Sequence, residues 1–475
     1  MYRPAYRLTV PAGELASAFA AIRAELAVPD GFPPEVIAEA ERTATEPSRP
    51  DADLTDVPFV TLDPPGATDL DQAMAIERAG AGHRVRYAIA DVPAFVPPGG
   101  AIDEEARRRG QTLYAPDTRI PLHPVRLSED AASLLPGRDR PAFVWTFLLD
   151  GDGAVTATEL QRALVRSRAQ LDYDSAQARI DAGTAHETIA LLAEVGERRI
   201  AREAARGGAS LARPEQEVER RDGGYRLRLR PPAAIENHNA QLSLMTGMAA
   251  AEIMLAGGVG ILRTMPPATD GAVARLRRQA HALGADWQQD VPYGAFLRTL
   301  DPGNARHLAL LHEAAGLFRG AGYTAFDGTP PDPSARVQAA IAAPYTHATA
   351  PLRRLVDRFT LACCEALHAG RAVPDWVRAG LPELPDLMRA SDQRAGALDR
   401  ACIDVVEATL LRDRVGETFT ADVVDLDERR GGALVQLTDP PVLAHCDGPL
   451  PLGEQVRVRL AGADPARRLV RFVPG

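Results

Sequence analysis

Three carboxylates and one amide are crowded into a short stretch of the chain, at Asp63, Asp69, Asp71 and Gln72. The segment Pro-Pro-Gly follows the first of them, which excludes a helix and places the acids on a tight loop. Carboxylate oxygens are ligands that Mg²⁺ prefers, and ions held in this way can promote in-line attack on a phosphodiester. The spacing therefore predicts a metal-binding phosphodiesterase site, with a solvated acidic turn as the alternative.

A second cluster that could bind phosphate lies far downstream, at Arg353 and Arg354, shortly after Pro351. Proline favours the first position of a helix, so both arginines are expected in the first turns, where backbone N–H groups also attract anions. An arginine pair at a helix start is often only a surface feature. Combined with the acidic loop, however, it would supply the cationic half of a phosphate-cleaving site.

The secondary-structure elements that must position these residues are predicted strands in the first part of the chain and predicted helices in the later part. Residues 59–62 and 73–76 are predicted strands on either side of the acidic loop, and 85–90 and 142–148 are further strands. Beyond residue 165 the apolar spacing becomes helical. Helices are predicted at 168–181, 185–205, 239–257, 271–283, 303–317, 335–342, 351–369 and 391–411. This order indicates an α+β fold, a twisted sheet with surrounding helices.

Three domains are expected. A small helical N-terminal module, residues 1–50, contains predicted helices at 12–27 and 34–43, in an arrangement that resembles a helix-turn-helix. The main α+β domain covers 51–411. Residues 412–475 form a C-terminal domain with four predicted strands, which suits a small OB-type barrel.

The amino-acid composition indicates a globular protein and gives no sign of a membrane-spanning segment. The 475 residues are 45% hydrophobic and 25% charged, which is typical of a globular protein with several domains. No apolar run approaches the roughly 20 residues that span a bilayer, and no secretory signal is recognisable, so we expect no membrane contact and a cytoplasmic location. The four cysteines lack metal-binding spacing and are expected to be reduced. A net charge of −10 argues against indiscriminate binding to nucleic acid.

Several spaced motifs together resemble the RNase II/RNase R family, whose catalytic domain is called RNB. The acidic loop resembles the family's block of aspartates, and the downstream Thr-Ala-Pro-Leu-Arg-Arg resembles its arginine block. Between them are the matching segments Ile89-Ala-Asp-Val92, Asp103-Glu-Glu-Ala-Arg-Arg-Arg-Gly110, Tyr114-Ala-Pro-Asp-Thr-Arg-Ile-Pro-Leu-His-Pro124, Leu127-Ser-Glu129 and Ser133-Leu134. The matches keep their order from about residue 59 to residue 411.

The resemblance implies a Mg²⁺-dependent exoribonuclease that degrades RNA from its 3′ end to nucleoside 5′-monophosphates. It assigns catalysis to Asp71, Asp69 and Arg353, and metal binding to Asp63, Asp69, Asp71 and Gln72. Tyr114 is expected to stack on the terminal nucleotides. Further substrate contacts are expected from Arg109, Asn239, His347, Thr349 and Arg354.

Some positions depart from the family pattern. Gln72 stands where the family usually has a fourth aspartate, which removes one charge from the metal site. Only about fifty residues precede the RNB-like block, so paired N-terminal OB domains are not expected, and a more open entrance would tolerate structured RNA. A monomer is expected. The alternatives are a catalytically impaired RNA-binding relative and a general metallophosphatase or DNase.

Overall fold

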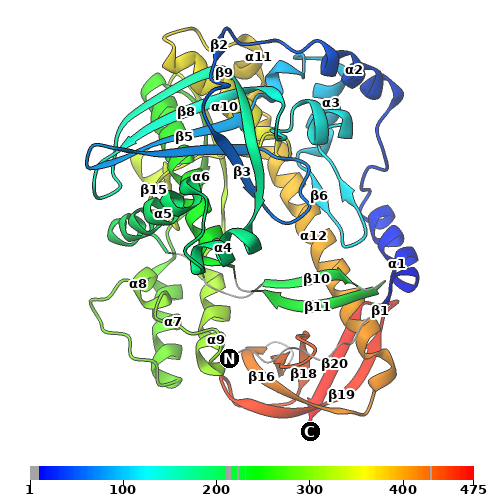
Figure 1. Ribbon diagram of the computed structural model, residues 1–475. Helices are drawn as coiled ribbons and strands as arrows, with labels where there is room; N and C mark the ends of the chain where they lie inside the picture. Colours follow the sequence, from blue (N-terminus) through cyan, green and yellow to red (C-terminus); the bar gives the residue numbers. More distant parts are fainter. Residues whose placement is uncertain (1–9, 210, 212–214, 222–223, 231, 428–430) are drawn as a thin grey trace.

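A computed structural model of the chain describes residues 10–209, 211, 215–221, 224–230, 232–427 and 431–475 (Figure 1). At its centre is a six-stranded sheet with the strand order β2-β9-β3-β4-β5-β8. The strands are β2 (Ala52–Asp53), β3 (Phe59–Asp63), β4 (Gln72–Ala79), β5 (Gly82–Ala90), β8 (Asp139–Leu149) and β9 (Val155–Asp172). The four strands predicted in this part of the sequence are confirmed.

The long strand β9 pairs with β8 and with β3 in this sheet. Its residues 155–166 run antiparallel to β8, and its residues 167–172 run parallel to β3. The pairings therefore pass through β3, β4, β5, β8 and β9 and return to β3. The acidic loop between β3 and β4 is thus anchored at both ends in paired strands.

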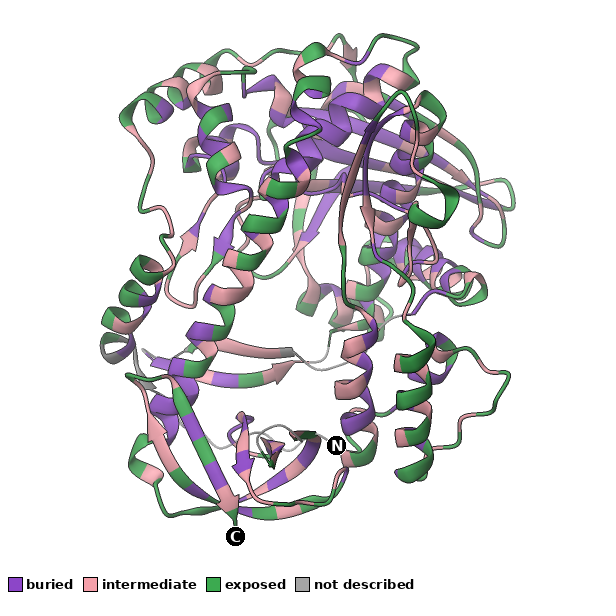
Figure 2. Cartoon of the chain, turned by 180° about the vertical axis from the view of Figure 1, so that it is seen from behind, coloured by how far each residue is buried: buried purple, intermediate pink, exposed green. Residues whose placement is uncertain are grey.

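Helices pack against this sheet and share its core. They are α4 (Tyr173–Asp181), α5 (Glu187–Arg206), α6 (Ala234–Gly257) and α10 (Leu355–His368). Trp145 of the sheet, Leu192, Met254 and Phe359 belong to one buried apolar cluster. Figure 2 shows buried residues concentrated in the strands and the inner sides of these helices. The predicted α+β fold is confirmed.

The two N-terminal helices, α1 (Ala12–Glu25) and α2 (Pro34–Thr45), contribute to different cores. Phe19 of α1 packs in a cluster with the C-terminal barrel, while Val36 of α2 packs in a cluster with the central sheet. A helix-turn-helix unit requires its helices to pack on each other, so that arrangement is not supported. Residues 1–9 of the predicted module lie outside the described residues, and the domain boundaries at 50 and 411 stay predictions.

A hairpin and a long helix lie between the central sheet and the C-terminal barrel (Figure 1). The hairpin is β10 (Glu215–Arg221) and β11 (Gly224–Arg230), which pairs in turn with β1 (Val10–Pro11). The helix α12 (Leu384–Leu411) starts well before the predicted residue 391. Its first turns belong to the core of the central sheet and its last turns to the core of the barrel.

The C-terminal domain is a closed barrel with the strand order β16-β17-β18-β20-β19. The strands are β16 (Thr418–Asp427), β17 (Gly432–Leu437), β18 (Leu443–Asp447), β19 (Gln455–Asp464) and β20 (Leu469–Pro474). The predicted OB-type barrel is confirmed. Strand β18 was not predicted, because its five residues, Leu-Ala-His-Cys-Asp, carry only a weak apolar alternation.

The remaining elements surround this framework. They are α3 (Ala101–Arg109), α7 (Asp270–Ala282), α8 (Tyr293–Leu297), α9 (Ala305–Ala314), α11 (Asp375–Gly380), β6 (Leu113–Tyr114), β7 (Arg119–Ile120), β12 (Val259–Thr264), β13 (Gly322–Asp327), β14 (Val337–Gln338) and β15 (Ala343–Pro344). None of the helices in the described ranges is long and apolar enough to cross a membrane. The helix predicted at 335–342 is wrong, because this segment forms β14 and a turn in which Ala342 has a φ of 55°.

The helix predicted from residue 351 begins only at Leu355. Two buried carboxylates accept hydrogen bonds from backbone N–H groups in the residues just before this helix. Asp71 Oδ1 accepts from the N–H of Leu352 at 2.7 Å, and Asp357 Oδ1 accepts from the N–H of Ala350 at 2.7 Å. These bonds hold the segment in a turn, so the two arginines precede the helix instead of lying in its first turns.

Candidate active site

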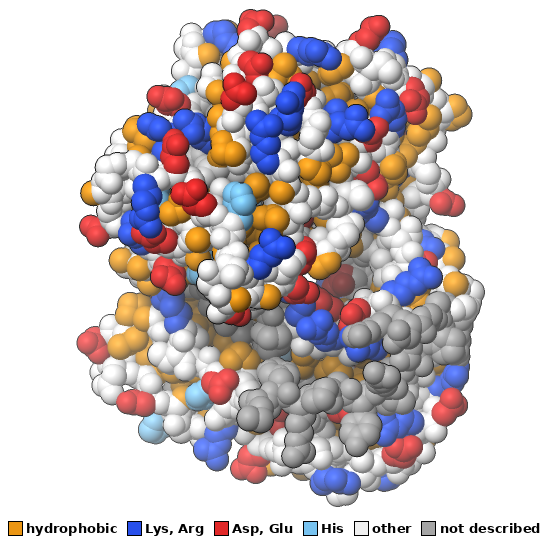
Figure 3. Space-filling model, in the orientation of Figure 1, with side chains coloured by type: hydrophobic (Ala, Val, Ile, Leu, Met, Phe, Trp, Pro, Cys, Tyr) orange, Lys and Arg blue, Asp and Glu red, His pale blue; other side chains and the backbone are white. Residues whose placement is uncertain are grey.

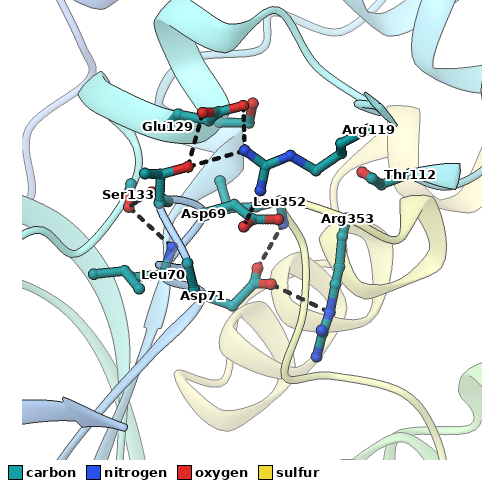
Figure 4. Close-up of polar contacts among 12 residues, drawn as sticks. Asp69, Leu70, Asp71, Thr112, Arg119, Glu129, Ser133, Leu352 and Arg353 are labelled. Carbon is teal, nitrogen blue, oxygen red and sulfur yellow. Dashed lines mark hydrogen bonds and ion pairs between the residues drawn. The ribbon is translucent and has the colours of Figure 1, made fainter. Parts of the chain in front are cut away.

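The acidic loop joins β3 to β4 and is fixed by hydrogen bonds to its backbone. Ser133 Oγ accepts from the N–H of Leu70 at 2.9 Å and donates to the carbonyl of Thr68 at 2.7 Å (Figure 4). Gly66 takes a φ of +80° in the turn, a conformation that favours glycine. The positions of the aspartates are therefore determined by the backbone and not only by side-chain packing.

The structure brings Asp71 and Arg353 together from distant parts of the sequence. Asp71 Oδ2 lies 3.5 Å from Arg353 Nε, and its side chain is 3% exposed while that of Arg353 is 50% exposed (Figure 4). Burial raises the pKa of Asp71 to about 8, although Arg353 and the Leu352 N–H act in the opposite direction. A buried carboxylate thus faces a guanidinium that remains accessible.

Asp63 is the last residue of β3 and lies in the same electrostatic environment. Burial raises its pKa to about 7, Arg353 lowers it and Asp69 raises it. Its Oδ2 atom is buried and has no hydrogen-bond partner among the described residues. A buried carboxylate oxygen without a partner is costly, which indicates that a cation or a proton completes this site.

Asp69 is held by partners within the protein. Its Oδ1 forms an ion pair with Arg119 Nη1, and its Oδ2 accepts from the hydroxyl of Tyr114 at 3.4 Å. Arg119 is itself oriented by Glu129 Oε1 at 2.5 Å and by Thr68 Oγ1 at 2.9 Å. Asp69 and Asp71 therefore each face a guanidinium, Asp69 that of Arg119 and Asp71 that of the half-exposed Arg353 at 3.5 Å.

Gln72 begins β4, and its amide nitrogen donates a hydrogen bond to the carbonyl oxygen of Thr349. This bond ties the end of the acidic loop to the segment that carries Arg353. The predicted role of Gln72 as a metal ligand is not tested by this contact, because only its amide oxygen could serve as a ligand.

A cavity of about 480 Å³ adjoins these residues. Its lining includes Gln72, Tyr173, Asn239, Thr349, Arg353 and Arg354. Asn239 Nδ2 donates to the hydroxyl of Tyr173 at 3.0 Å, and its Oδ1 is buried without a partner in the described structure. The predicted substrate residues Asn239, Thr349 and Arg354 are thus assembled around one space.

Arg354 lines this cavity, and His347 lies in the same segment of the chain. Arg354 binds the buried carboxylate of Asp357 through two contacts, at 2.5 and 2.8 Å. His347 Nδ1 lies 2.5 Å from the hydroxyl of Tyr323, and burial together with the nearby arginines lowers its pKa well below the ordinary value. His347 is therefore a neutral imidazole at physiological pH.

Arg109 was predicted to contact substrate, but the structure places it elsewhere. It is buried, pairs with Glu105 at 2.8 Å and lies 3.8 Å from the ring centroid of Phe32. It also donates to the carbonyls of Gly31 and Pro121. Because these partners occupy the guanidinium, Arg109 holds the N-terminal segment against α3 instead of facing the cavity.

Sequence reasoning assigned no role to Arg119, Glu129, Ser133 or Tyr173. The first three lie in segments that resemble family motifs, but their spacing from the acidic loop gave no sign that they contact it. Tyr173 directly follows β9, and its side chain meets the cavity because β9 pairs with β3. That proximity depends on tertiary structure.

The donor set fits a hard divalent cation in its chemistry, since Asp63 and Asp71 supply buried carboxylate oxygens. The arrangement is not a complete cage. Within the part of the chain that the structure describes, no group of three or more His, Cys, Asp or Glu residues could hold a metal ion as it stands.

Comparisons with known proteins agree with this architecture. The RNB domain model matches residues 51–367, and the model of the RNase II-type exonuclease C-terminal S1 domain matches residues 417–475. The chain therefore belongs to the RNase II/RNase R family of RNB-domain proteins.

Relatives within the family differ in activity. Exoribonuclease 2 of Cronobacter sakazakii is 26% identical over 84% of this chain and 62% of its own length. A protein of Arabidopsis thaliana named Inactive exonuclease DIS3L2 is 42% identical over 27% of this chain and 12% of its own length. The chain thus spans less than two thirds of the length of these curated relatives.

Among solved structures, Mycoplasma genitalium RNase R in complex with ribose-methylated single-stranded RNA superimposes with a TM-score of 0.85. The identity is 17%, and the match covers 96% of this chain and 78% of that protein. This likeness establishes the fold.

Proposed function

We propose that the protein is a Mg²⁺-dependent exoribonuclease that removes nucleotides from the 3′ end of RNA and releases nucleoside 5′-monophosphates. The observation that carries this proposal is the pairing of Asp71 with Arg353 beside a cavity. Membership of the family supports ribonuclease chemistry. The same proposal includes a cytoplasmic location and a monomeric enzyme, as the sequence predicts.

In this proposal the arginine and the aspartates have different roles in the reaction. Arg353 lines the cavity and can neutralise the phosphate, which carboxylates alone would repel. Asp63 and Asp71 are the residues best suited to hold Mg²⁺, because their carboxylates are buried and their charges are not fully compensated. When bound, Mg²⁺ lowers the pKa of water and neutralises charge on the scissile phosphate.

Tyr114 is suited to bind the RNA bases. The residue is 53% exposed, although its hydroxyl approaches Asp69. An exposed ring that is tethered at one end offers a stacking surface that tolerates any base, worth roughly 1–3 kcal/mol per base. Tyr114 also lines a second cavity of about 790 Å³, between the hairpin strand β10 and α12.

The surface outside the site suits a substrate that is bound locally. Figure 3 shows acidic and basic side chains interspersed on one face of the molecule, with no broad basic surface there. Together with the net charge of −10, this favours recognition of an RNA end by a few placed residues over electrostatic attraction along its whole length.

A catalytically impaired RNA-binding relative is the second candidate. Two observations favour it: Gln72 adds no negative charge to the site, and Asp69 is compensated by Arg119. A protein named as inactive among the relatives is consistent with loss of activity within the family.

End-labelled single-stranded RNA separates these candidates. Incubation with Mg²⁺ should release mononucleotides from the 3′ end, and release should stop with EDTA or in Asp71→Asn. Binding without cleavage would support the impaired relative. Equal degradation of a DNA oligomer would instead support a general nuclease.

A further inference from the structure

The hairpin that carries Tyr114 is held at its base by residues of the candidate active site. It consists of β6 and β7, and Tyr114 is the last residue of β6. Just before β6, the N–H of Thr112 donates to the carbonyl of Arg353 at 2.9 Å. The hydroxyl of Tyr114 approaches Asp69 at 3.4 Å. The base of the hairpin is therefore attached to both sides of the site.

The tip of the same hairpin is held by the N-terminal helix α1. Arg23, in the last turn of α1, donates from Nη1 to Asp117 Oδ1 at 2.7 Å. Asp117 lies in the turn between β6 and β7, and the two side chains are 23% and 18% exposed. Leu113 of β6 and Ile120 of β7 belong to the same apolar cluster as Phe19 of α1. The helix is thus joined to the hairpin by an ion pair and by a shared core.

Helix α1 is also anchored to the barrel and to the β10–β11 hairpin, beside which it lies in Figure 1. Glu25 accepts from Arg468, in the turn before β20, at 2.6 Å. The ring of Phe19 meets that of Tyr225 in β11 edge-on, with the centroids 5.3 Å apart. Strand β1, which leads directly into α1, pairs with β11. The helix is therefore a fixed support for the tip of the β6–β7 hairpin.

Tyr114 lies between the two points at which its hairpin is attached. It directly precedes the turn, and residues 114–116 line the cavity of about 790 Å³. Backbone hydrogen bonds between Ala115 and Thr118, at 2.9 and 3.3 Å, close the turn. A two-stranded hairpin of this size is at best marginally stable by itself. The ion pair at its tip therefore limits how far the ring of Tyr114 can move.

We propose that Arg23 is a positioning residue for RNA binding: through Asp117 it holds the β6–β7 hairpin so that the ring of Tyr114 is ready to stack on a base. Helix α1 orders the ring in the free protein, so RNA binding does not have to supply the free energy for that ordering. The inference rests on the proposed function, because it takes Tyr114 to be a residue that binds RNA.

A pair of matched substitutions tests the contact between α1 and the hairpin. Asp117→Asn and Glu25→Gln each remove one negative charge and one ion pair of α1, but only Asp117 belongs to the hairpin. A partly exposed ion pair contributes at most about a fivefold factor, so Asp117→Asn should weaken binding of single-stranded RNA by about three- to fivefold. Glu25→Gln should not weaken it.

Fluorescence anisotropy in EDTA measures these affinities, and thermal unfolding shows that each variant is folded. The loss of a negative charge by itself favours binding of an anion, so a weaker affinity in Asp117→Asn cannot be an effect of net charge. An affinity that is unchanged or tighter in Asp117→Asn, or an equal loss in Glu25→Gln, would overturn the proposal.

A double substitution shows whether Arg23 acts through Tyr114. Arg23→Met should weaken RNA binding by about three- to fivefold in the otherwise unaltered protein. Combined with Tyr114→Ala, the same change should add less than about twofold, because the ring that Arg23 positions is gone. The same loss in both backgrounds would show that Arg23 affects RNA by another route and would refute its role.

A measurement without RNA tests the positioning itself. Thr118 is exposed in the turn, and the four native cysteines are buried, so a nitroxide label on Thr118→Cys reports on the hairpin tip. Arg23→Met should narrow the electron paramagnetic resonance spectrum of this label, because the turn gains mobility on the nanosecond timescale. Glu25→Gln should leave the spectrum unchanged. A spectrum that is insensitive to Arg23→Met would contradict the inference.

The outcome is separable from that of the proposed function. If RNA affinity depends on Arg23 through Tyr114 but no mononucleotides are released, the ribonuclease proposal fails and the role of Arg23 stands. If mononucleotides are released and Arg23→Met binds RNA as tightly as the unaltered protein, the reverse holds.

Discussion

Arg354 and Asp357 form a two-bond ion pair directly before and within the first turn of α10. Nε and Nη2 of the arginine lie 2.5 and 2.8 Å from the two carboxylate oxygens, and the Asp357 side chain is fully buried. Asp357 also accepts the N–H of Ala350. The pair therefore fixes the turn that presents Arg353 to Asp71.

Removal of one partner from this pair should be strongly destabilising. We expect Asp357→Ala to lower the free energy of unfolding by about 3–5 kcal/mol, because it leaves a guanidinium without its counter-charge in a buried site. Urea denaturation measures the loss. Arg371→Ala, which breaks an exposed pair with Glu365, should cost no more than about 1 kcal/mol. Similar losses in both variants would show that the buried pair has no special importance.

Arg353 should affect catalysis more than stability. Its side chain is half exposed, so Arg353→Met should leave the thermal unfolding midpoint nearly unchanged. The kcat for RNA degradation should fall by about 10²–10³-fold, as when a placed donor to a developing negative charge is removed. Arg353→Lys should restore part of the rate, because a lysine keeps the charge but lacks the planar fork. A kcat unaffected by Arg353→Met would exclude this residue from the reaction.

Tyr114 should contribute through its ring. Tyr114→Ala is expected to weaken binding of single-stranded RNA by roughly 1–3 kcal/mol, which fluorescence anisotropy can measure in EDTA. Tyr114→Phe keeps the ring and loses only the 3.4 Å contact with Asp69, so its affinity should remain close to that of the unaltered protein. Equal losses in the two variants would assign the effect to the hydroxyl.

Stability without divalent cations should depend on pH through Asp63 and Asp71. Burial raises their pKa values to about 7 and about 8, above those of the unfolded chain, so the folded protein binds more protons. Their stabilising contribution is complete below about pH 4 and is lost as the pH rises to about 8, at no more than about 1.4 kcal/mol per pH unit for each group.

Urea denaturation in EDTA between pH 5 and pH 8 measures this slope. Asp71→Asn should reduce the slope, since the amide does not titrate. Addition of Mg²⁺ should stabilise the protein more at pH 8 than at pH 5, because the cation competes with protons for the same oxygens. A stability gain from Mg²⁺ that is independent of pH would argue against binding to these carboxylates.

Much of the fold and part of the site could be predicted from the sequence. The strands around the acidic loop were recognisable because buried strands carry continuous apolar residues, and the pairing of the loop with Arg353 followed from the resemblance to the family. Local patterns could not indicate where α10 starts, because Asp71 and Asp357 capture backbone groups there through tertiary contacts. The ion pair between Arg119 and Asp69 also depends on how β7 is placed, and the burial of Arg109 depends on the position of Phe32.

The helix α12 connects the core of the central sheet to the core of the C-terminal barrel. It is one continuous helix of 28 residues, about 40 Å long, embedded at its start beside the central sheet and at its finish in the barrel. A straight helix anchored in both cores keeps the barrel at a fixed distance from the central sheet. An RNA that bound both the barrel and the Asp71–Arg353 pair would have to span the distance between them, and for such an RNA we expect fragments shorter than that distance to lose contact with the barrel.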